Sequence, residues 1–214
     1  MTHAIEEGIP YWPTQPKYEA ITMNHQKNGD ESYWRKIIFC EHTGTHIDAG
    51  SHFILGARNV DEIPITQIMG RGVKIDVTDI RPKRTVSISD IQRFESQHGS
   101  IKKDDIVFFR FGWDEKWGVG NKGAGFLCDW PGTSAKAARY LLDKGVKAVG
   151  TDTLALDAAG SDNPSHKILL GNGVNIIENV NKLGELPVFF GVIGFPCKFK
   201  GGSGATMRLV AVID

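Results

Sequence analysis

Hydrophobic and polar positions divide the chain into short apolar runs and a few longer amphipathic stretches. The apolar runs are rich in Val, Ile and Phe and are bounded by Gly, Pro or Asp, a pattern typical of strands. Two of these runs are nearly continuous, as in strands that are buried on both faces. The pattern predicts strands over residues 35–40, 73–77, 106–111, 148–151, 188–193 and 207–212.

Two amphipathic stretches predict helices. Residues 89–98 open on Ser89 or Asp90 as the cap and end before a glycine, and residues 133–144 carry apolar side chains at helical spacing. Residues 165–170 and 176–183 fit either a helix or a strand. A helix followed directly by a strand at residues 133–151 is an α/β unit, so we expect an α/β protein with a mixed, largely buried sheet.

Composition narrows the class of protein. The chain has 214 residues with 25 basic and 25 acidic side chains, so its formal charge of zero argues against a nucleic-acid platform. No apolar run approaches the roughly 18 to 20 residues that span a bilayer, and Glu6 and Glu7 interrupt the N-terminal segment where a secretory signal would be apolar. Without a repeat or a linker, residues 1–214 predict one domain in a soluble, cytoplasmic protein that contacts neither membrane nor nucleic acid.

The cysteines carry little chemistry. Cys40, Cys128 and Cys197 are odd in number and far apart, and no Cys-x-x-Cys pair is present. Neither a disulfide framework nor a thiolate zinc site is therefore indicated.

A histidine cluster is the strongest indication of chemistry. His42, His46 and His52 fall within eleven residues, with Asp48 between them. The alternative is a polar loop whose histidines pack or face solvent. Three imidazoles and a carboxylate at spacings of 4, 2 and 4 instead favour a metal site.

The cluster requires a bend in the chain. In an extended strand, His42 and His46 would stand ~13 Å apart, too far to share an ion whose bonds are about 2 Å long. Gly44 is the residue able to take the unusual dihedrals of a bend. Two imidazoles and one carboxylate leave coordination positions open, and they suit Zn or Mn without deciding between them. His52 can then move protons, or it can be a fourth ligand or orient Asp48.

The stretch His42-Thr-Gly-Thr-His46-Ile-Asp48-Ala-Gly-Ser-His52 resembles the signature of the cyclase family, which includes bacterial kynurenine formamidase and isatin hydrolase. The resemblance continues along nearly the whole chain. It includes Gly8-Ile-Pro-Tyr-Trp12-Pro, Trp130-Pro-Gly132, Gly150-Thr-Asp-Thr-Leu-Ala-Leu-Asp157, His166-Lys-Ile-Leu-Leu170, Glu178-Asn-Val-Asn-Lys-Leu183 and Gly201-Gly-Ser-Gly-Ala-Thr-Met-Arg208.

Membership would imply a fold and a ligand set. The fold would be the swivelling β/β/α fold, with a mixed, barrel-like central sheet flanked by helices. By this resemblance, His42, His46 and Asp48 match the ligands of a first Mn²⁺ or Zn²⁺ ion. His166 and Glu178 match those of a second, with Asp48 as the bridge, although the sequence around Glu178, taken alone, favours an ordinary solvated glutamate.

The resemblance also implies an activity, with His52 as the catalytic acid and base. The ion would activate water for attack on an amide, and an aromatic substrate would lie against Trp12. Phe53 and the pair Gly112-Trp113 favour the isatin hydrolase branch, so Phe53 and Trp113 are further candidate substrate contacts. The family also predicts a homodimer or a higher homo-oligomer.

Other activities remain open on the same scaffold. They are an arylformamidase acting on N-formylkynurenine, a lactone or ester hydrolase, and a metal-dependent binding protein without catalysis. The sequence departs from the family at Gly50, where proline is usual, and at Ala155, where serine is common. The loss of proline removes a stiffening element from the metal loop.

Overall fold

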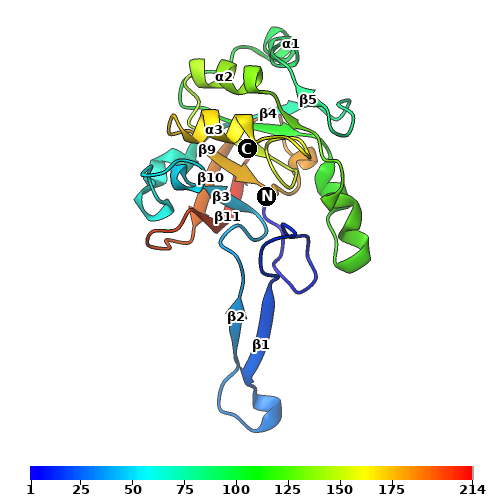
Figure 1. The fold of residues 1–214 in the computed structure, drawn as a ribbon, viewed down its shortest axis with the longest axis vertical. Coiled ribbons are helices and arrows are strands. Elements are labelled where there is room, and N and C mark those ends of the chain that lie inside the picture. The colour runs from blue at the N-terminus through cyan, green and yellow to red at the C-terminus, as the bar shows by residue number, and fades with distance from the viewer. Residues whose placement is uncertain (214) are drawn as a thin grey trace.

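The centre of the molecule is a closed seven-stranded β-barrel (Figure 1). The structure, a computed structural model, describes residues 1–213. Around the barrel the strand order is β10 (Phe189–Pro196), β11 (Gly204–Val212), β3 (His46–Asp48), β9 (Asn175–Glu178), β8 (Ala148–Thr151), β6 (Ile106–Arg110) and β4 (Met69–Asp76).

The barrel sheet is mixed, as the sequence predicts. Strands β4, β6, β8 and β9 run parallel to one another, whereas β3, β10 and β11 pair antiparallel. The parallel strands are covered on both faces, so β8 is buried throughout and β6 is buried from Ile106 to Phe109. The expected α/β class with a barrel-like sheet is confirmed.

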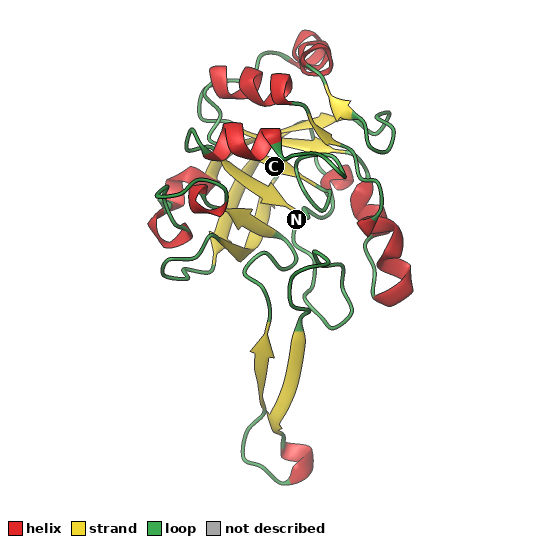
Figure 2. Ribbon diagram, in the orientation of Figure 1, coloured by secondary structure: helices red, strands yellow, loops and turns green. Residues whose placement is uncertain are grey.

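Three helices lie together on one side of the barrel (Figure 2). They are α1 (Ile88–His98), α2 (Ala135–Asp143) and α3 (Pro164–Leu170), and a two-stranded parallel sheet of β5 (Thr85–Val86) and β7 (Gly132–Thr133) lies beside them. Apolar side chains of all three helices share one core with the outward-facing residues of the barrel strands. Of the two ambiguous stretches, 165–170 is helical and 176–183 begins as strand β9.

A second core fills the barrel itself, and glycines make room for it. Phe108 and Phe190 are buried inside, and their ring centroids lie 5.8 Å apart. Gly150 lies directly opposite Phe108 in the sheet, where an added Cβ would come within 2.3 Å of the ring. The apolar run at 148–151 therefore needs its glycine for packing rather than for backbone flexibility.

A β-hairpin projects from the barrel (Figure 1). Its strands are β1 (Glu19–Asn24) and β2 (Trp34–Ile38), which pair only with each other. The strand predicted at 35–40 therefore exists but does not belong to the barrel, and β1 was not predicted.

Short 3₁₀ turns connect many of these elements, and no helix of the described residues is long and apolar enough to cross a bilayer. The turns are η1 (Gln26–Asn28), η2 (Gly50–His52), η3 (Val60–Glu62), η4 (Ile65–Ile68), η5 (Trp113–Lys116), η6 (Gly120–Leu127) and η7 (Leu183–Glu185).

The barrel core gives the first prediction. Gly150→Ala should lower the free energy of unfolding by about 1 to 3 kcal/mol, because the new methyl group overpacks a ring that cannot move away. Gly125→Ala is the matched control, since an added Cβ there meets nothing within 4 Å and should change stability by less than about 0.5 kcal/mol. Denaturant unfolding measures both, and equal stability of the two variants would contradict the packing argument.

Candidate active site

The segment from His42 to His52 bends where the sequence requires it. Gly44 has a left-handed φ of 66°, and the chain then enters β3 at His46. Strand β3 lies between β11 and β9, and its register places His46 directly opposite Glu178. Because paired residues of an antiparallel ladder point to the same face, Glu178 and His46 project together. A glutamate 132 residues away in sequence is thereby brought to the histidine cluster.

Two buried carboxylates lie at the centre of the site. Asp48 Oδ1 is 3.4 Å from His46 Nε2, and Asp48 Oδ2 is 3.6 Å from His166 Nε2. Glu178 approaches the same two imidazoles, at 3.5 Å from His46 Nε2 and 3.0 Å from His166 Nε2. His46, Asp48 and Glu178 each offer an atom within 4.8 Å of the others, a spacing from which they could hold one ion.

His46 and His166 both point their Nε2 atoms toward Asp48 and Glu178, and each ring is held in that orientation by a hydrogen bond at Nδ1. His46 Nδ1 lies 2.9 Å from the Gly44 carbonyl oxygen, and His166 Nδ1 lies 2.7 Å from Asp157 Oδ2. An acceptor at Nδ1 fixes the proton there and leaves Nε2 free as a donor to a metal ion, the usual arrangement for a metal-ligating histidine.

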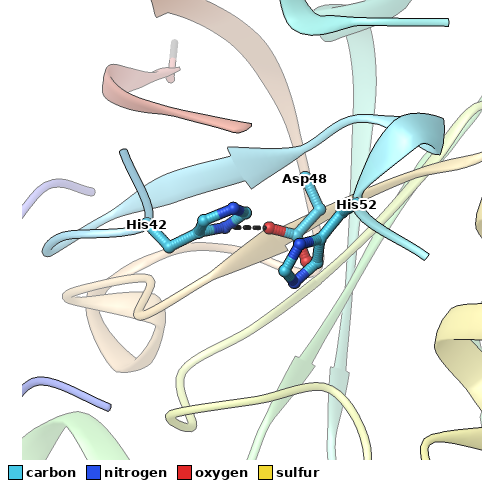
Figure 3. A group of neighbouring side chains, drawn as sticks. All are labelled: His42, Asp48 and His52. Carbon is cyan, nitrogen blue, oxygen red and sulfur yellow. Dashed lines mark hydrogen bonds and ion pairs between the residues drawn. The ribbon is translucent and has the colours of Figure 1, made fainter. Parts of the chain in front are cut away.

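His42 and His52 both lie beside the carboxylate of Asp48 (Figure 3). His42 Nδ1 lies 2.8 Å from Asp48 Oδ1, and its Nε2 lies 3.0 Å from Ser203 Oγ, which in turn donates to Glu41. The His52 ring comes from η2 and lies 4.1 Å from the His42 ring, centroid to centroid. With Asp48, these histidines make a second set of atoms within 4.8 Å of one another. Asp48 is thus common to both sets, and His46 groups with Glu178 rather than with His42.

The charges of the cluster compensate one another. Burial lowers the pKa of His46, but Asp48 and Glu178 outweigh it and raise that pKa to about 10. Burial likewise opposes ionisation of Asp48, yet the surrounding histidines hold its pKa well below the ordinary value. The pKa of His166 is raised by Asp157, Asp48 and Glu178 against the effect of burial. His52 differs, because burial lowers its pKa and favours the neutral imidazole.

The surroundings of one carboxylate oxygen, Asp48 Oδ2, indicate whether these residues suit a metal ion. Asp48 Oδ2 is buried and has no hydrogen-bond partner among the described residues. A buried carboxylate oxygen without a partner is costly, and a cation would compensate it. Imidazole nitrogens and carboxylate oxygens also match the ligands that Zn and Mn prefer. The donor set and the unpaired oxygen both fit a divalent ion.

The cluster forms one side of a cavity of about 270 Å³. Trp12 and Phe53 line it: Trp12 lies edge-on to Trp130 with centroids 5.9 Å apart, and the Phe53 ring lies 4.8 Å from that of His166. Ala155, one of the two departures from the family pattern, also lines the cavity. The other, Gly50, begins η2 and has no room for a Cβ, which would lie 2.9 Å from the Ala57 Cβ atom.

Trp113, a candidate substrate contact from the sequence, does not line this cavity. It is buried in the core beside the barrel, and its Nε1 donates to the Phe126 carbonyl oxygen at 3.0 Å. With its polar atom satisfied there, Trp113 packs the core, and the structure does not bring it to the site.

Sequence reasoning missed two residues that hold the site together. Asp157 accepts from the backbone N–H and the ring of His166, and it closes the Gly150–Asp157 stretch already singled out. Asn179 donates to the Gly44 carbonyl oxygen at 2.9 Å and lines the cavity. Its position directly after Glu178 was the available indication.

Comparison with known proteins assigns this chain to a family. Residues 1–158 match the family model described as "Putative cyclase". Isatin hydrolase of Roseibium aggregatum is 26% identical over 92% of this chain and 82% of its own length. Kynurenine formamidase of Salinibacter ruber is 24% identical over 98% of this chain and 94% of its own length.

Solved structures agree with the sequence relatives. Isatin hydrolase A from Labrenzia aggregata, bound to benzyl benzoate, superposes with a TM-score of 0.90 at 28% identity, covering 100% of this chain and 92% of that one. An isatin hydrolase bound to the product analogue thioisatinate has a TM-score of 0.86 at 25% identity, covering 97% and 87%. Both superpositions therefore extend over almost the entire fold.

The charge balance of the cluster predicts a pH dependence for the metal-free protein. The folded pKa of His46, about 10, lies above the unfolded value near 6.5. Its ionic contribution to stability is therefore complete below pH 6.5 and is lost as the pH rises through about 10. After chelation, ¹⁵N shifts of the His46 ring should show both nitrogens protonated at pH 8, with His46→Gln identifying the signals. A neutral ring at that pH would contradict the assignment.

Proposed function

The chain belongs to the cyclase family of metal-dependent hydrolases, and from this membership we propose that it hydrolyses the carbon–nitrogen bond of a small cyclic amide fused to an aromatic ring, as in isatin. The observation that carries the proposal is the convergence of His46, Asp48 and Glu178 beneath a cavity lined by Trp12 and Phe53. A pocket that suits an aromatic ring thus lies next to the side chains that could bind a metal ion.

The ion in this proposal is Mn²⁺ or Zn²⁺, one or two per subunit. His42, His46 and His166 all approach the carboxylate of Asp48, and Glu178 contacts the rings of His46 and His166. Asp48 would be shared by two ions, because His42 and His46 approach its Oδ1 atom and His166 approaches its Oδ2 atom. A bound divalent ion would supply the Lewis acidity that polarises a carbonyl group and makes water a nucleophile near neutral pH.

The protein side chains would supply binding and proton transfer. The indole of Trp12 and the ring of Phe53 provide flat apolar surface for an aromatic substrate. His52 lines the same cavity, and its neutral imidazole can accept a proton from the attacking water and return it to the departing nitrogen. His166 is held by Glu178 and Asp157, His46 by the Gly44 carbonyl oxygen and His42 by Asp48. Among the described imidazoles that line the cavity, His52 is therefore the one available for this role.

The rival substrates share this machinery. An arylformamide such as N-formylkynurenine has the same aromatic ring and an amide bond, and a lactone or ester differs in its leaving atom. A binding protein without turnover is the alternative that agrees least with the relatives, which are named as enzymes. We further propose that the protein acts in the cytoplasm as a homodimer or higher homo-oligomer.

A substrate panel tests the activity. Purified protein loaded with Mn²⁺ or Zn²⁺ should hydrolyse isatin, and chelation should abolish turnover because the two carboxylates and the imidazoles cannot activate water alone. Absorbance at the isatin band measures the rate, with N-formylkynurenine and an aromatic lactone assayed in parallel. Faster metal-dependent turnover of one of these would reassign the substrate, and binding without turnover of any would contradict hydrolysis.

Two substitutions separate metal binding from proton transfer. His52→Ala should keep the ion, measured by elemental analysis after gel filtration, yet lose about 10²- to 10⁴-fold in turnover. His46→Ala should lose both the ion and the activity. His98→Ala, at the end of α1, is the control and should retain both. If His52→Ala kept more than a tenth of the wild-type rate, its assigned role would be wrong.

A further inference from the structure

Apart from the histidine cluster, the wall of the cavity is uncharged. The imidazole and carboxylate side chains that line the cavity all belong to the cluster: His42, His46, His52, His166 and Glu178. No lysine, arginine or aspartate of residues 1–213 lines it. The uncharged wall is formed by the loop of residues 10–15 together with Phe53, Leu154, Ala155 and Asn163.

Lys17 is the cation nearest to this wall in sequence, and it lies outside the cavity. Its Nζ atom is 5.9 Å from the centroid of the Tyr11 ring, and the side chain is exposed. An ammonium group in water interacts only weakly with a charge on the far side of a ring, because the solvent screens it. The uncharged wall therefore has no counter-ion to offer a ligand.

Two side-chain amides give the wall its hydrogen-bonding capacity. Gln15 comes from the loop that holds Trp12, and Asn163 directly precedes α3. Both residues are half-buried, and within residues 1–213 their hydrogen bonds are made by their backbone groups. Their amides are thus available to a ligand, in contrast to that of Asn179, which donates to the Gly44 carbonyl oxygen.

The rest of the wall is apolar. Leu154 and Ala155 are both buried and line the cavity side by side in sequence. Ala155 has no hydroxyl group at a position where serine is common in the family, and its carbonyl oxygen already accepts from Thr153 Oγ1 at 2.7 Å. Apolar surface with two neutral amides is the environment that this wall provides.

Such an environment discriminates by charge. Burial of an unpaired charge costs far more than burial of a neutral polar group whose hydrogen bonds are matched. An amide supplies one acceptor oxygen and an NH₂ donor, which match a neutral carbonyl, hydroxyl, amide or sulfonamide group. The amino-acid chain of N-formylkynurenine instead brings an ammonium and a carboxylate, for which this wall has no partner. Isatin is neutral throughout.

We propose that the uncharged wall is a subsite for the part of the substrate that lies away from the scissile bond. In this subsite Gln15 and Asn163 bind an uncharged hydrogen-bonding substituent on the aromatic ring, and a charged substituent is excluded. The inference rests on the proposed function, because it takes the histidine cluster as the place of hydrolysis. It narrows the substrate to aromatic amides that carry no charge on the ring, and it ranks formanilide above N-formylkynurenine.

A matched pair of substrates tests the exclusion of charge. Isatin-5-sulfonamide and isatin-5-sulfonate have similar size and both withdraw electrons from the ring, but only the second is charged. For the metal-loaded protein, kcat/KM should be within about fivefold of isatin for the sulfonamide and at least about 100-fold lower for the sulfonate. Formanilide should likewise exceed N-formylkynurenine. Equal kcat/KM values for sulfonamide and sulfonate overturn the subsite.

Charge-introducing variants locate the subsite. Gln15→Arg and Asn163→Arg each place a cation in the wall and should raise the sulfonate-to-sulfonamide ratio of kcat/KM at least about tenfold. Asn172→Arg adds the same charge at an exposed position beyond the end of α3 and should leave the ratio within about twofold. An unchanged ratio in both wall variants, or an equal rise in Asn172→Arg, overturns the assignment. Circular dichroism verifies the fold, and either wall variant suffices.

The substrate series also separates this inference from the proposed function. Turnover of isatin with no discrimination by charge rejects the subsite and leaves the hydrolase in place. If isatin and formanilide are both inert, the proposed function is wrong, and calorimetric titration of the metal-loaded protein with the same pair tests the subsite alone. The sulfonamide should then bind at least about tenfold more tightly than the sulfonate. Equal affinities, or no binding of the sulfonamide, overturn the inference.

Discussion

The buried carboxylate of Asp48 is the constraint around which the site is organised. Its side chain is almost fully buried in the barrel wall, and one of its oxygens has no hydrogen-bond partner among the described residues. Negative charge in such a place must be matched by positive charge, because the surroundings cannot solvate it. His42, His46 and His166 converge on it for that reason, and Asp157 and the Gly44 carbonyl hold two of those rings in orientation. A cation and a set of protonated imidazoles are alternative solutions to the same electrostatic problem.

The regular elements were predictable wherever burial dictates the residue pattern. Strand β8 and helix α1 agree with their predicted ranges to within one residue, since the first is buried on both faces and the second is capped. The β1–β2 hairpin was not predictable in the same way. Strand β1 has no buried face, so no alternation marks it, and β2 has the composition of a barrel strand without being part of the barrel.

The candidate site could be predicted only as far as local spacing extends. The bend at Gly44 follows from the length of an extended chain, and the structure shows it. The meeting of Glu178 with His46 depends on the register of β3 against β9, which no spacing reveals. Local spacing can also mislead. Trp113 and Trp117 are four residues apart, and from sequence such a pair fits the wall of a pocket and a packed core equally well. The family resemblance, carried by motifs spread over the whole chain, supplied the long-range contacts that periodicity could not.

The place of β3 in the barrel has a consequence for biosynthesis. This three-residue strand is held between β9 and β11, both near the C-terminal end of the chain. At ordinary elongation rates the ribosome needs roughly ten to thirty seconds to add the residues that separate β3 from β11. During that time the nascent chain presents its histidines and Asp48 without the strands that flank them in the barrel. The centre is thus completed last, and a polypeptide released before β11 cannot assemble it.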